Sequence, residues 1–196
     1  MTDPRRLKLL GILAGVVTSA LTLLAWTQQW FGLTLTTGQV LPVGGDVGGP
    51  ALVALALAGL ALVAALSIAG RFFGVVLGVL EAAIGGLVVL TSALSIADPV
   101  KATASVVTGA TAVSGDAAVR ELVASVSVTA WPWFAIVFGA LTAIVGVFIA
   151  VTAPRWPDGS RKYRAVRLEQ PDAEQDAVGA WDALSEGDDP TVAGRK

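Results

Sequence analysis

The residues that could perform chemistry are few in this chain, and one carboxylate, Glu81, is the most unusual of them. The chain has 196 residues and contains no His and no Cys. These absences exclude histidine-dependent nucleophilic triads, thiolate chemistry and zinc sites built from Cys and His. A carboxylate metal site needs several clustered acids, whereas Glu81 is the only acid within the long apolar runs of the sequence. We therefore expect a non-enzymatic protein that holds no cofactor or metal.

Four apolar runs, at about residues 9–26, 51–69, 72–96 and 131–153, must position that carboxylate. Each has roughly the ~20 residues that cross a ~30 Å hydrocarbon core as a helix. Only 14% of the chain is charged, compared with about 25% in soluble domains. We therefore predict an all-α, polytopic membrane protein with a four-helix transmembrane bundle in residues 1–153. Residues 27–50 and 97–130 would be outer loops, and residues 154–196 a mostly disordered cytoplasmic tail.

The basic residues predict which way the chain crosses the membrane. Only Lys101 and Arg120 lie in the two longer connections between runs. The other basic residues fall before the first run, between the second and third runs, or after the fourth. The positive-inside rule then places both termini on the cytoplasmic side of the plasma membrane. Residues 5–26 also resemble a signal peptide, but the run is long and no clear Ala-x-Ala site follows, so we expect it to be retained.

Glu81 is expected near the bilayer centre, ~13 Å from the cytoplasmic end at ~1.5 Å per residue. Small residues recur every fourth position along the same run, as Gly74, Gly78, Ala82 and Gly86. This pattern lets helices approach closely, and Gly11 and Gly15 repeat it in the first run. Because Glu81 lies about −20° around the helix from Gly74, it should point into the bundle.

The predicted spans contain no basic residue that could pair with Glu81. Hydroxyl groups at similar depth come from the first and fourth runs, namely Thr18, Ser19 and Thr142. Burial without a counter-charge favours the protonated acid, so we predict a neutral Glu81 hydrogen-bonded to one of these hydroxyls. Two interpretations stay open: a structural interhelix bond worth ~1 kcal/mol, and a proton- or cation-coupling site.

Aromatic and polar patterns describe the outer segments. Indoles favour the membrane boundary, so four tryptophans are predicted to anchor the outer ends of the first and fourth helices: Trp26, Trp30, Trp131 and Trp133. The partial alternation of residues 31–41 predicts a short hairpin. Further along, Asp116 should cap an amphipathic helix over residues 117–127. We expect that helix to lie on the membrane surface or over the outer face of the bundle.

The tail is basic first and then acidic. Residues 155–167 suit the anionic headgroups of the inner leaflet, and residues 169–189 have the composition of a disordered segment. If residues 172–185 became helical, an apolar face would form from Val178, Trp181 and Leu184. Such a face favours docking to a cytoplasmic protein, with a solvated tail as the plain alternative.

Short motifs are spread over most of the chain. They are Arg5-Arg6-Leu7-Lys8, residues 49–58, Thr129-Ala130-Trp131-Pro132, Arg155-Trp156-Pro157, Tyr163-Arg164 and residues 181–191. The last, with the sequence WDALSEGDDPT, is the most specific, because an acidic composition alone does not produce it. With these motifs the chain resembles the Trp biosynthesis-associated (tryptophan-operon-associated) integral membrane proteins, a bacterial family of small four-span proteins. The resemblance implies an association with tryptophan biosynthesis and no particular reaction.

The leading hypothesis is a non-enzymatic accessory membrane protein, linked to tryptophan biosynthesis by resemblance, whose tail docks a cytoplasmic partner. The alternative is a small transporter or transporter subunit for an amino acid or related metabolite, with Glu81 as the coupling residue. The expected partners are the lipid bilayer, a cytoplasmic protein and, through the glycine faces, further copies of the chain. Nothing in the sequence favours a nucleic acid as partner.

Overall fold

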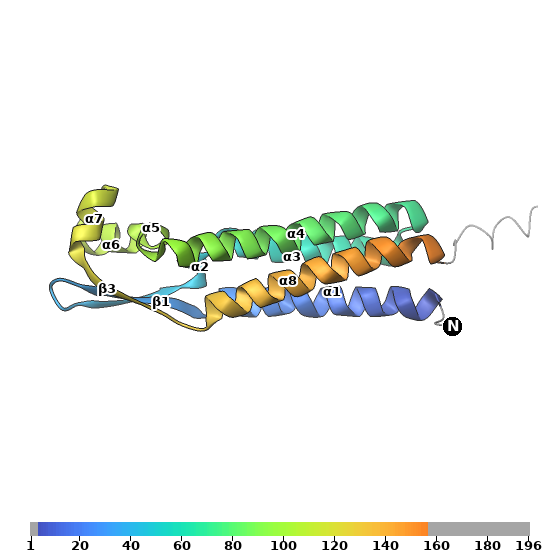
Figure 1. The fold of residues 1–196 in the computed structure, drawn as a ribbon, viewed down its shortest axis with the longest axis horizontal. Coiled ribbons are helices and arrows are strands. Elements are labelled where there is room, and N and C mark those ends of the chain that lie inside the picture. Colours follow the sequence, from blue (N-terminus) through green and yellow to red (C-terminus); the bar gives the residue numbers. More distant parts are fainter. Residues whose placement is uncertain (1–3, 157–196) are drawn as a thin grey trace, which may run out of the picture. The chain divides into compact units, whose positions relative to one another are not determined.

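Four long helices form the transmembrane part of the protein, and Figure 1 shows them side by side. They are α1 (Pro4–Trp26), α3 (Ala51–Ile68), α4 (Arg71–Ala97) and α8 (Trp131–Thr152), the last continued by the short 3-10 turn η1 (Ala153–Arg155). All four are long and apolar enough to cross a membrane. The computed structural model describes residues 4–156. The predicted fold class, a helical membrane protein with four spans, is confirmed.

The four helices form a ring in which α1 contacts α3 and α8, and α4 contacts the same two neighbours. Each helix turns a regular stripe of residues into this ring. On α4, spacings of four and three alternate along the buried residues, which are Gly74, Gly78, Glu81, Gly85, Val88, Ser92 and Ser95. A mean spacing of about 3.5 residues is that of left-handed helix packing, with crossing angles near 20°.

The closest approach in the ring is between α4 and α8, where glycines of one helix lie against the backbone of the other. A Cβ atom placed on Gly78 would lie 2.6 Å from the Ala150 nitrogen and 2.8 Å from the Gly146 carbonyl oxygen. A Cβ atom on Gly85 would meet the Gly139 carbonyl oxygen in the same way. No side chain fits at these contacts, and we call them the glycine seam, defined by Gly78, Gly85, Gly139 and Gly146.

The predicted four-residue repeat on α4 is wrong at its last member. Gly86 is exposed, with no atom within 4 Å of a Cβ built on it, and Gly85 takes the buried position instead. A strict four-residue repeat advances about 40° per step, so after three steps it has turned about 120° away from the seam. The other predicted packing residues are buried, or half-buried in the case of Ala82: Gly74, Gly78, Ala82, Gly11 and Gly15.

A three-stranded antiparallel sheet lies beyond one end of the bundle, which we call the sheet end (Figure 1). Its strands are β1 (Gln29–Leu35), β2 (Val40–Gly44) and β3 (Val123–Val128), in the spatial order β2-β1-β3. Leu33 in the central strand pairs with Leu41 on one side and Val126 on the other. The predicted hairpin in the first connection is therefore confirmed, and it extends from Gln29 to Gly44.

The predicted helix over residues 117–127 is wrong in its second half. The helix α7 (Asp116–Leu122) ends at Leu122, and the chain continues as β3. The residues of β3, Val-Ala-Ser-Val-Ser-Val, alternate with the period of a strand and pair with β1 through main-chain hydrogen bonds. Asp116 does not cap α7 either, because Gly115, at φ 105°, is the N-cap residue and no side chain caps the helix.

An apolar core joins the sheet to the adjoining helix ends. It includes Trp30, Phe31, Leu33, Leu52, Val88, Val107 and Val119. Three short helices complete this end, α2 (Gly45–Gly48), α5 (Pro99–Ala102) and α6 (Ala104–Thr111). The Trp30 Nε1 donates a hydrogen bond to the Ala25 carbonyl oxygen at 2.8 Å. Trp30 is therefore a core residue of the sheet end, and the prediction that it anchors the membrane boundary is corrected.

The opposite end of the bundle, which we call the basic end, carries Lys8, Arg71 and Arg155. The Lys8 Nζ donates to the carbonyl oxygens of Ser67 and Ala69 at 3.0 and 3.2 Å, so it caps the end of α3. The same ammonium lies 5.5 Å from the ring centroid of Trp156, within cation–π range. The Arg71 Nε donates to the Trp156 carbonyl oxygen at 2.6 Å. These contacts tie α1, α3, α4 and the residue after η1 together.

Candidate functional site

Glu81 lies inside the ring of helices, with only 1% of its surface exposed. The buried stripe of α4 carries it there, because Gly78 and Gly85 on either side hold α4 against α8. The void beside its carboxyl group is lined by Leu62, Val63, Leu66, Leu77 and Ile149, and it has no room for a water molecule. The void at Glu81 is therefore apolar and dry.

Gly59 of α3 is the point where the carboxyl group meets a second polar side chain. A Cβ atom built on Gly59 would lie 2.8 Å from the Ser19 Oγ of α1. The same atom would lie 3.3 and 3.6 Å from the two carboxyl oxygens of Glu81. Because glycine has no side chain, α1 and α4 can direct both polar groups toward the same place on α3.

The predicted hydrogen bonds from Glu81 to Thr18 and Thr142 are not made. Neither carboxyl oxygen has a hydrogen-bond partner among residues 4–156. The Thr18 Oγ1 donates to the Gly15 carbonyl oxygen at 3.2 Å, and the Thr142 Oγ1 to that of Phe138 at 2.9 Å. A helical threonine can use the carbonyl oxygen three or four residues earlier, so each hydroxyl is satisfied within its own helix. Ser19 is the predicted hydroxyl that the fold does bring beside Glu81.

The other tryptophans predicted to anchor the outer helix ends lie at the ends of α1 and α8. Trp26 and Trp131 are half-buried, and Trp133 is 56% exposed. The predicted docking residues Val178, Trp181 and Leu184 lie outside the described residues.

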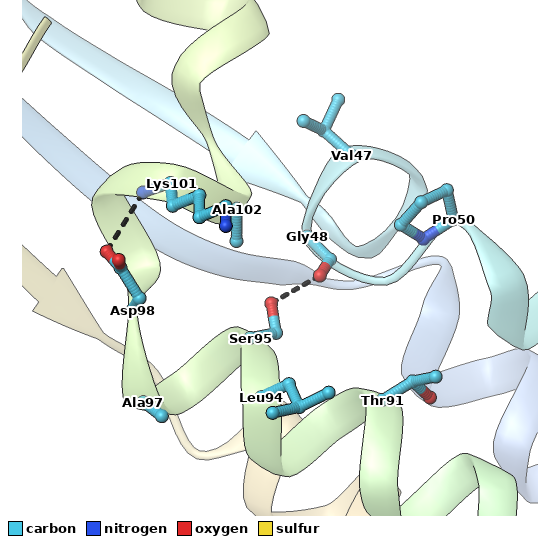
Figure 2. A pocket seen from close by; sticks show the side chains of 10 residues that line it. All are labelled: Val47, Gly48, Pro50, Thr91, Leu94, Ser95, Ala97, Asp98, Lys101 and Ala102. Carbon is cyan, nitrogen blue, oxygen red and sulfur yellow. Dashed lines mark hydrogen bonds between the residues drawn. The ribbon is translucent and has the colours of Figure 1, made fainter. Parts of the chain in front are cut away.

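A second site, which the sequence reasoning missed, is a cavity of about 530 Å³ that we call the sheet-end cavity. Figure 2 shows it between α2, the last turns of α4, and α5. The Ser95 Oγ donates a hydrogen bond to the Gly48 carbonyl oxygen and so links α4 to α2 along one side. Most of the lining is apolar and includes Val47, Pro50, Leu94, Ala97 and Ala102.

Asp98 and Lys101 are the charged residues of this cavity. The Asp98 Oδ1 accepts the Lys101 backbone N–H at 3.1 Å, and the Oδ2 pairs with Arg120. The bond from the Lys101 N–H and then the Arg120 guanidinium lower the pKa of Asp98 below its ordinary value of 3.8. The Lys101 ammonium makes no hydrogen bond or ion pair within the part of the chain that the structure describes. Figure 2 shows its side chain extending from α5 over the cavity.

The fold and these sites define a polytopic transmembrane protein whose bundle holds one buried acid. Across residues 4–156, no three His, Cys, Asp or Glu side chains lie close enough together to hold a metal ion. The family model of the tryptophan-associated transmembrane proteins matches residues 8–191, and the chain belongs to that family. This membership confirms the resemblance that the motifs indicated. Searches of the curated proteins and of the solved structures each found no match.

Proposed function

We propose that this protein is a non-enzymatic accessory protein of the plasma membrane that serves tryptophan biosynthesis by binding other molecules. Membership of the tryptophan-associated family supports the link with tryptophan. The full sequence has no His and no Cys, and most nucleophilic and thiol catalysis depends on one of them. This composition supports a binding role without turnover of a substrate.

Both termini are proposed to lie in the cytoplasm, so that the sheet faces the opposite side. Among residues 4–156, five of the seven basic residues lie at the basic end, as the positive-inside rule requires: Arg5, Arg6, Lys8, Arg71 and Arg155. Because the chain lacks cysteine, single substitutions can test this orientation. A membrane-impermeant maleimide should label Thr36→Cys, in the turn between β1 and β2, on intact cells, and Ser67→Cys only after permeabilisation. The reverse pattern would contradict the orientation.

The observation that carries the accessory role is the closed bundle. The glycine seam brings α4 and α8 together backbone to backbone, and Glu81 beside it adjoins a space too small for water. A translocation path between α4 and α8 would have to separate these two helices along their length. The bundle therefore suits a scaffold better than a conduit.

The binding element of this scaffold is proposed to be the tail, through Val178, Trp181 and Leu184. The test is a strain that lacks this protein, grown without tryptophan, with intracellular tryptophan and its precursors measured. The unsubstituted chain and Glu81→Gln should both restore the original levels. The double substitution Trp181→Ala with Leu184→Ala should fail to restore them, because it removes the apolar face that would dock.

The matched control is Val192→Ala, which shortens an apolar side chain of the tail outside the docking face. It should restore function as well as the unsubstituted chain does. All variants must be present in the membrane in equal amounts. Full activity of the double substitution would refute docking through this face.

A transporter or transporter subunit is the second candidate, and the buried Glu81 without a partner favours it. An acid inside the membrane is costly and often functional. Because the four-helix ring of a single copy is closed, transport would require a homo-oligomer. It would make tryptophan or precursor flux into vesicles of the purified protein depend on Glu81, with Glu81→Gln abolishing it. It would leave the Trp181→Ala, Leu184→Ala variant active, the opposite of the docking result.

A further inference from the structure

We propose that the sheet-end cavity binds a small zwitterion with a large apolar group, as in an aromatic α-amino acid. This inference goes beyond the accessory role, because it needs neither the tail nor a cytoplasmic partner. The cavity measures about 530 Å³, within the ~300–1,000 Å³ of typical small-molecule sites. Such sites combine a mostly apolar lining with a few fixed polar groups, and the lining described above has this composition.

The apolar wall is suited to a flat hydrocarbon group. Leu94, at the end of α4, is 62% exposed, and Val47 and Pro50 belong to the same lining on the α2 side. These side chains do not belong to the fully buried core, so a ligand could cover them without displacing packed residues.

The charges around the cavity favour a dipolar ligand over a simple anion. Lys101 offers an ammonium without a hydrogen bond or ion pair among the described residues, and Asp98 beside it is engaged by Arg120. The lining of the cavity itself therefore holds one acid and one base, Asp98 and Lys101, which balance in charge. A ligand with no net charge fits this balance, provided that its carboxylate reaches Lys101.

The ammonium of such a ligand would find acceptors on the other side of the cavity. The last carbonyl groups of α4 carry the partial negative charge of a helix C-terminus, which attracts cations. The Gly48 carbonyl oxygen adjoins them and already accepts the Ser95 hydroxyl. Ser95 is only 5% exposed, so this bond holds α2 and α4 at a fixed separation. The acceptors are therefore in place before a ligand arrives.

A phospholipid with an ammonium-bearing headgroup has the same chemistry as an amino acid, a zwitterionic head on an apolar body. The two sources can be separated by the composition of the bilayer. The full chain should be placed in nanodiscs of phosphatidylglycerol alone, which carry no ammonium headgroup, and in matched discs that also contain phosphatidylethanolamine. L-Tryptophan is the first probe, measured by equilibrium dialysis with the radiolabelled compound. The choice of tryptophan over other aromatic amino acids rests on the proposed function.

We expect L-tryptophan to bind in the phosphatidylglycerol discs. Tryptamine, which lacks the carboxylate, and indole-3-propionate, which lacks the ammonium, should each bind at least about tenfold more weakly. Lys101→Gln should weaken L-tryptophan about tenfold and leave tryptamine unchanged, whereas Arg155→Gln, at the basic end, should change neither. Ala97→Trp fills the cavity from an exposed position and should abolish binding, and Ala110→Trp on α6 is its matched control.

Each outcome of these binding measurements supports or contradicts the proposed site. Absence of binding by both L-tryptophan and L-phenylalanine at millimolar concentration would overturn the proposal, as would binding that Lys101→Gln and Ala97→Trp leave unchanged. Binding of L-phenylalanine but not L-tryptophan would support the cavity and contradict its link with tryptophan. Displacement of the amino acid by phosphatidylethanolamine would support the same recognition chemistry and assign the lipid as the natural occupant.

Discussion

Two acids on the same polypeptide segment, Glu81 within α4 and Asp98 at its end, have opposite surroundings. Glu81 is 1% exposed, and no described residue bonds its carboxyl group. Asp98 accepts the Lys101 backbone N–H and pairs with Arg120. The difference shows which parts of the chain can supply a hydrogen-bonding or charged partner to an acid. At a helix end the following loop can fold back and supply charge, whereas inside the spans every neighbouring helix must remain apolar to enter lipid.

The same comparison separates the two candidate sites. Around Glu81, α4 is held so closely to α8 that only glycine fits between them. At Asp98, α2, the end of α4 and α5 border an open cavity instead. Tight packing favours rigidity and excludes ligands, while a cavity leaves room for one. Substitutions can test each half of this contrast.

The largest loss of stability is expected from placing a side chain in the glycine seam beside Glu81. Gly85→Leu places a side chain against the Gly139 carbonyl oxygen and should force α4 and α8 apart. We expect a loss of about 3 kcal/mol or more of stability, with most of the protein lost as aggregate. Size-exclusion chromatography and thermal unfolding in detergent measure this.

Gly86→Leu is the matched control for the seam, because Gly86 is adjacent in sequence and faces open space. It should elute and unfold like the unsubstituted protein. Equal behaviour of the two variants would show that the α4–α8 contact is looser than described, and the contrast with the sheet end would disappear.

A smaller and opposite effect is expected when the carboxyl group itself is removed. Glu81→Leu replaces a buried, unbonded polar group with an apolar one of similar size, so it should raise the free energy of unfolding by about 1–3 kcal/mol. Glu81→Gln keeps a polar group and should remain close to the unsubstituted protein. Thermal unfolding of both variants in one detergent tests this. Destabilisation by Glu81→Leu would show that the acid has a partner after all.

Gly59→Ala tests the place where Ser19 and Glu81 converge. The added methyl group would lie 2.8 Å from the Ser19 Oγ, so we expect a loss of about 1 kcal/mol. Ser19→Ala, introduced together with Gly59→Ala, removes the closest contact and should recover most of that loss. A double-mutant cycle based on thermal unfolding measures the coupling. Additive effects would mean that the Ser19 hydroxyl does not lie against Gly59.

The smallest effect concerns Asp98 and pH. Its pKa is lowered in the folded protein, so its contribution to stability is present above the ordinary pKa of 3.8 and is lost as pH falls toward the folded value. Asp98→Asn should therefore lose less melting temperature between about pH 5 and about pH 3 than the unsubstituted protein does. Asp46→Asn, at an exposed position of α2, is the matched control. An identical pH profile for Asp98→Asn would contradict the role of its two contacts.

Several parts of this structure could be predicted from sequence because they depend on sums over neighbouring residues. The four spans follow from runs of apolar side chains, and the hairpin from short alternation around Gly38, which adopts φ 85° in the turn. The inward direction of Glu81 follows from its angular distance to Gly74 on one helix. Each of these inferences needed only local periodicity.

Other parts required knowledge of which segments meet. Val123 and Val126 continue the apolar stripe of Val119 and Leu122 at helical spacing, although residues 123–128 also alternate as a strand does. The pairing with β1 decides for the strand. The hydroxyl near Glu81 is that of Ser19, not Thr18 or Thr142, because its position depends on the absent side chain of Gly59 on a third helix. The cavity had one weak signal, an Asp before Pro99 at the end of an apolar run, which indicates a new helix start.

The sequence alone determined that four helices lie in lipid and that one acid points into the bundle. Hydropathy and angular spacing decide these two features, and both are properties of each segment by itself. Which glycine lies in the seam, which hydroxyl lies beside the acid, and where a ligand could enter were decided only in the tertiary structure. These features depend on the distances between helices that are far apart in the sequence. Contacts between the helix backbones at single residues determine those distances.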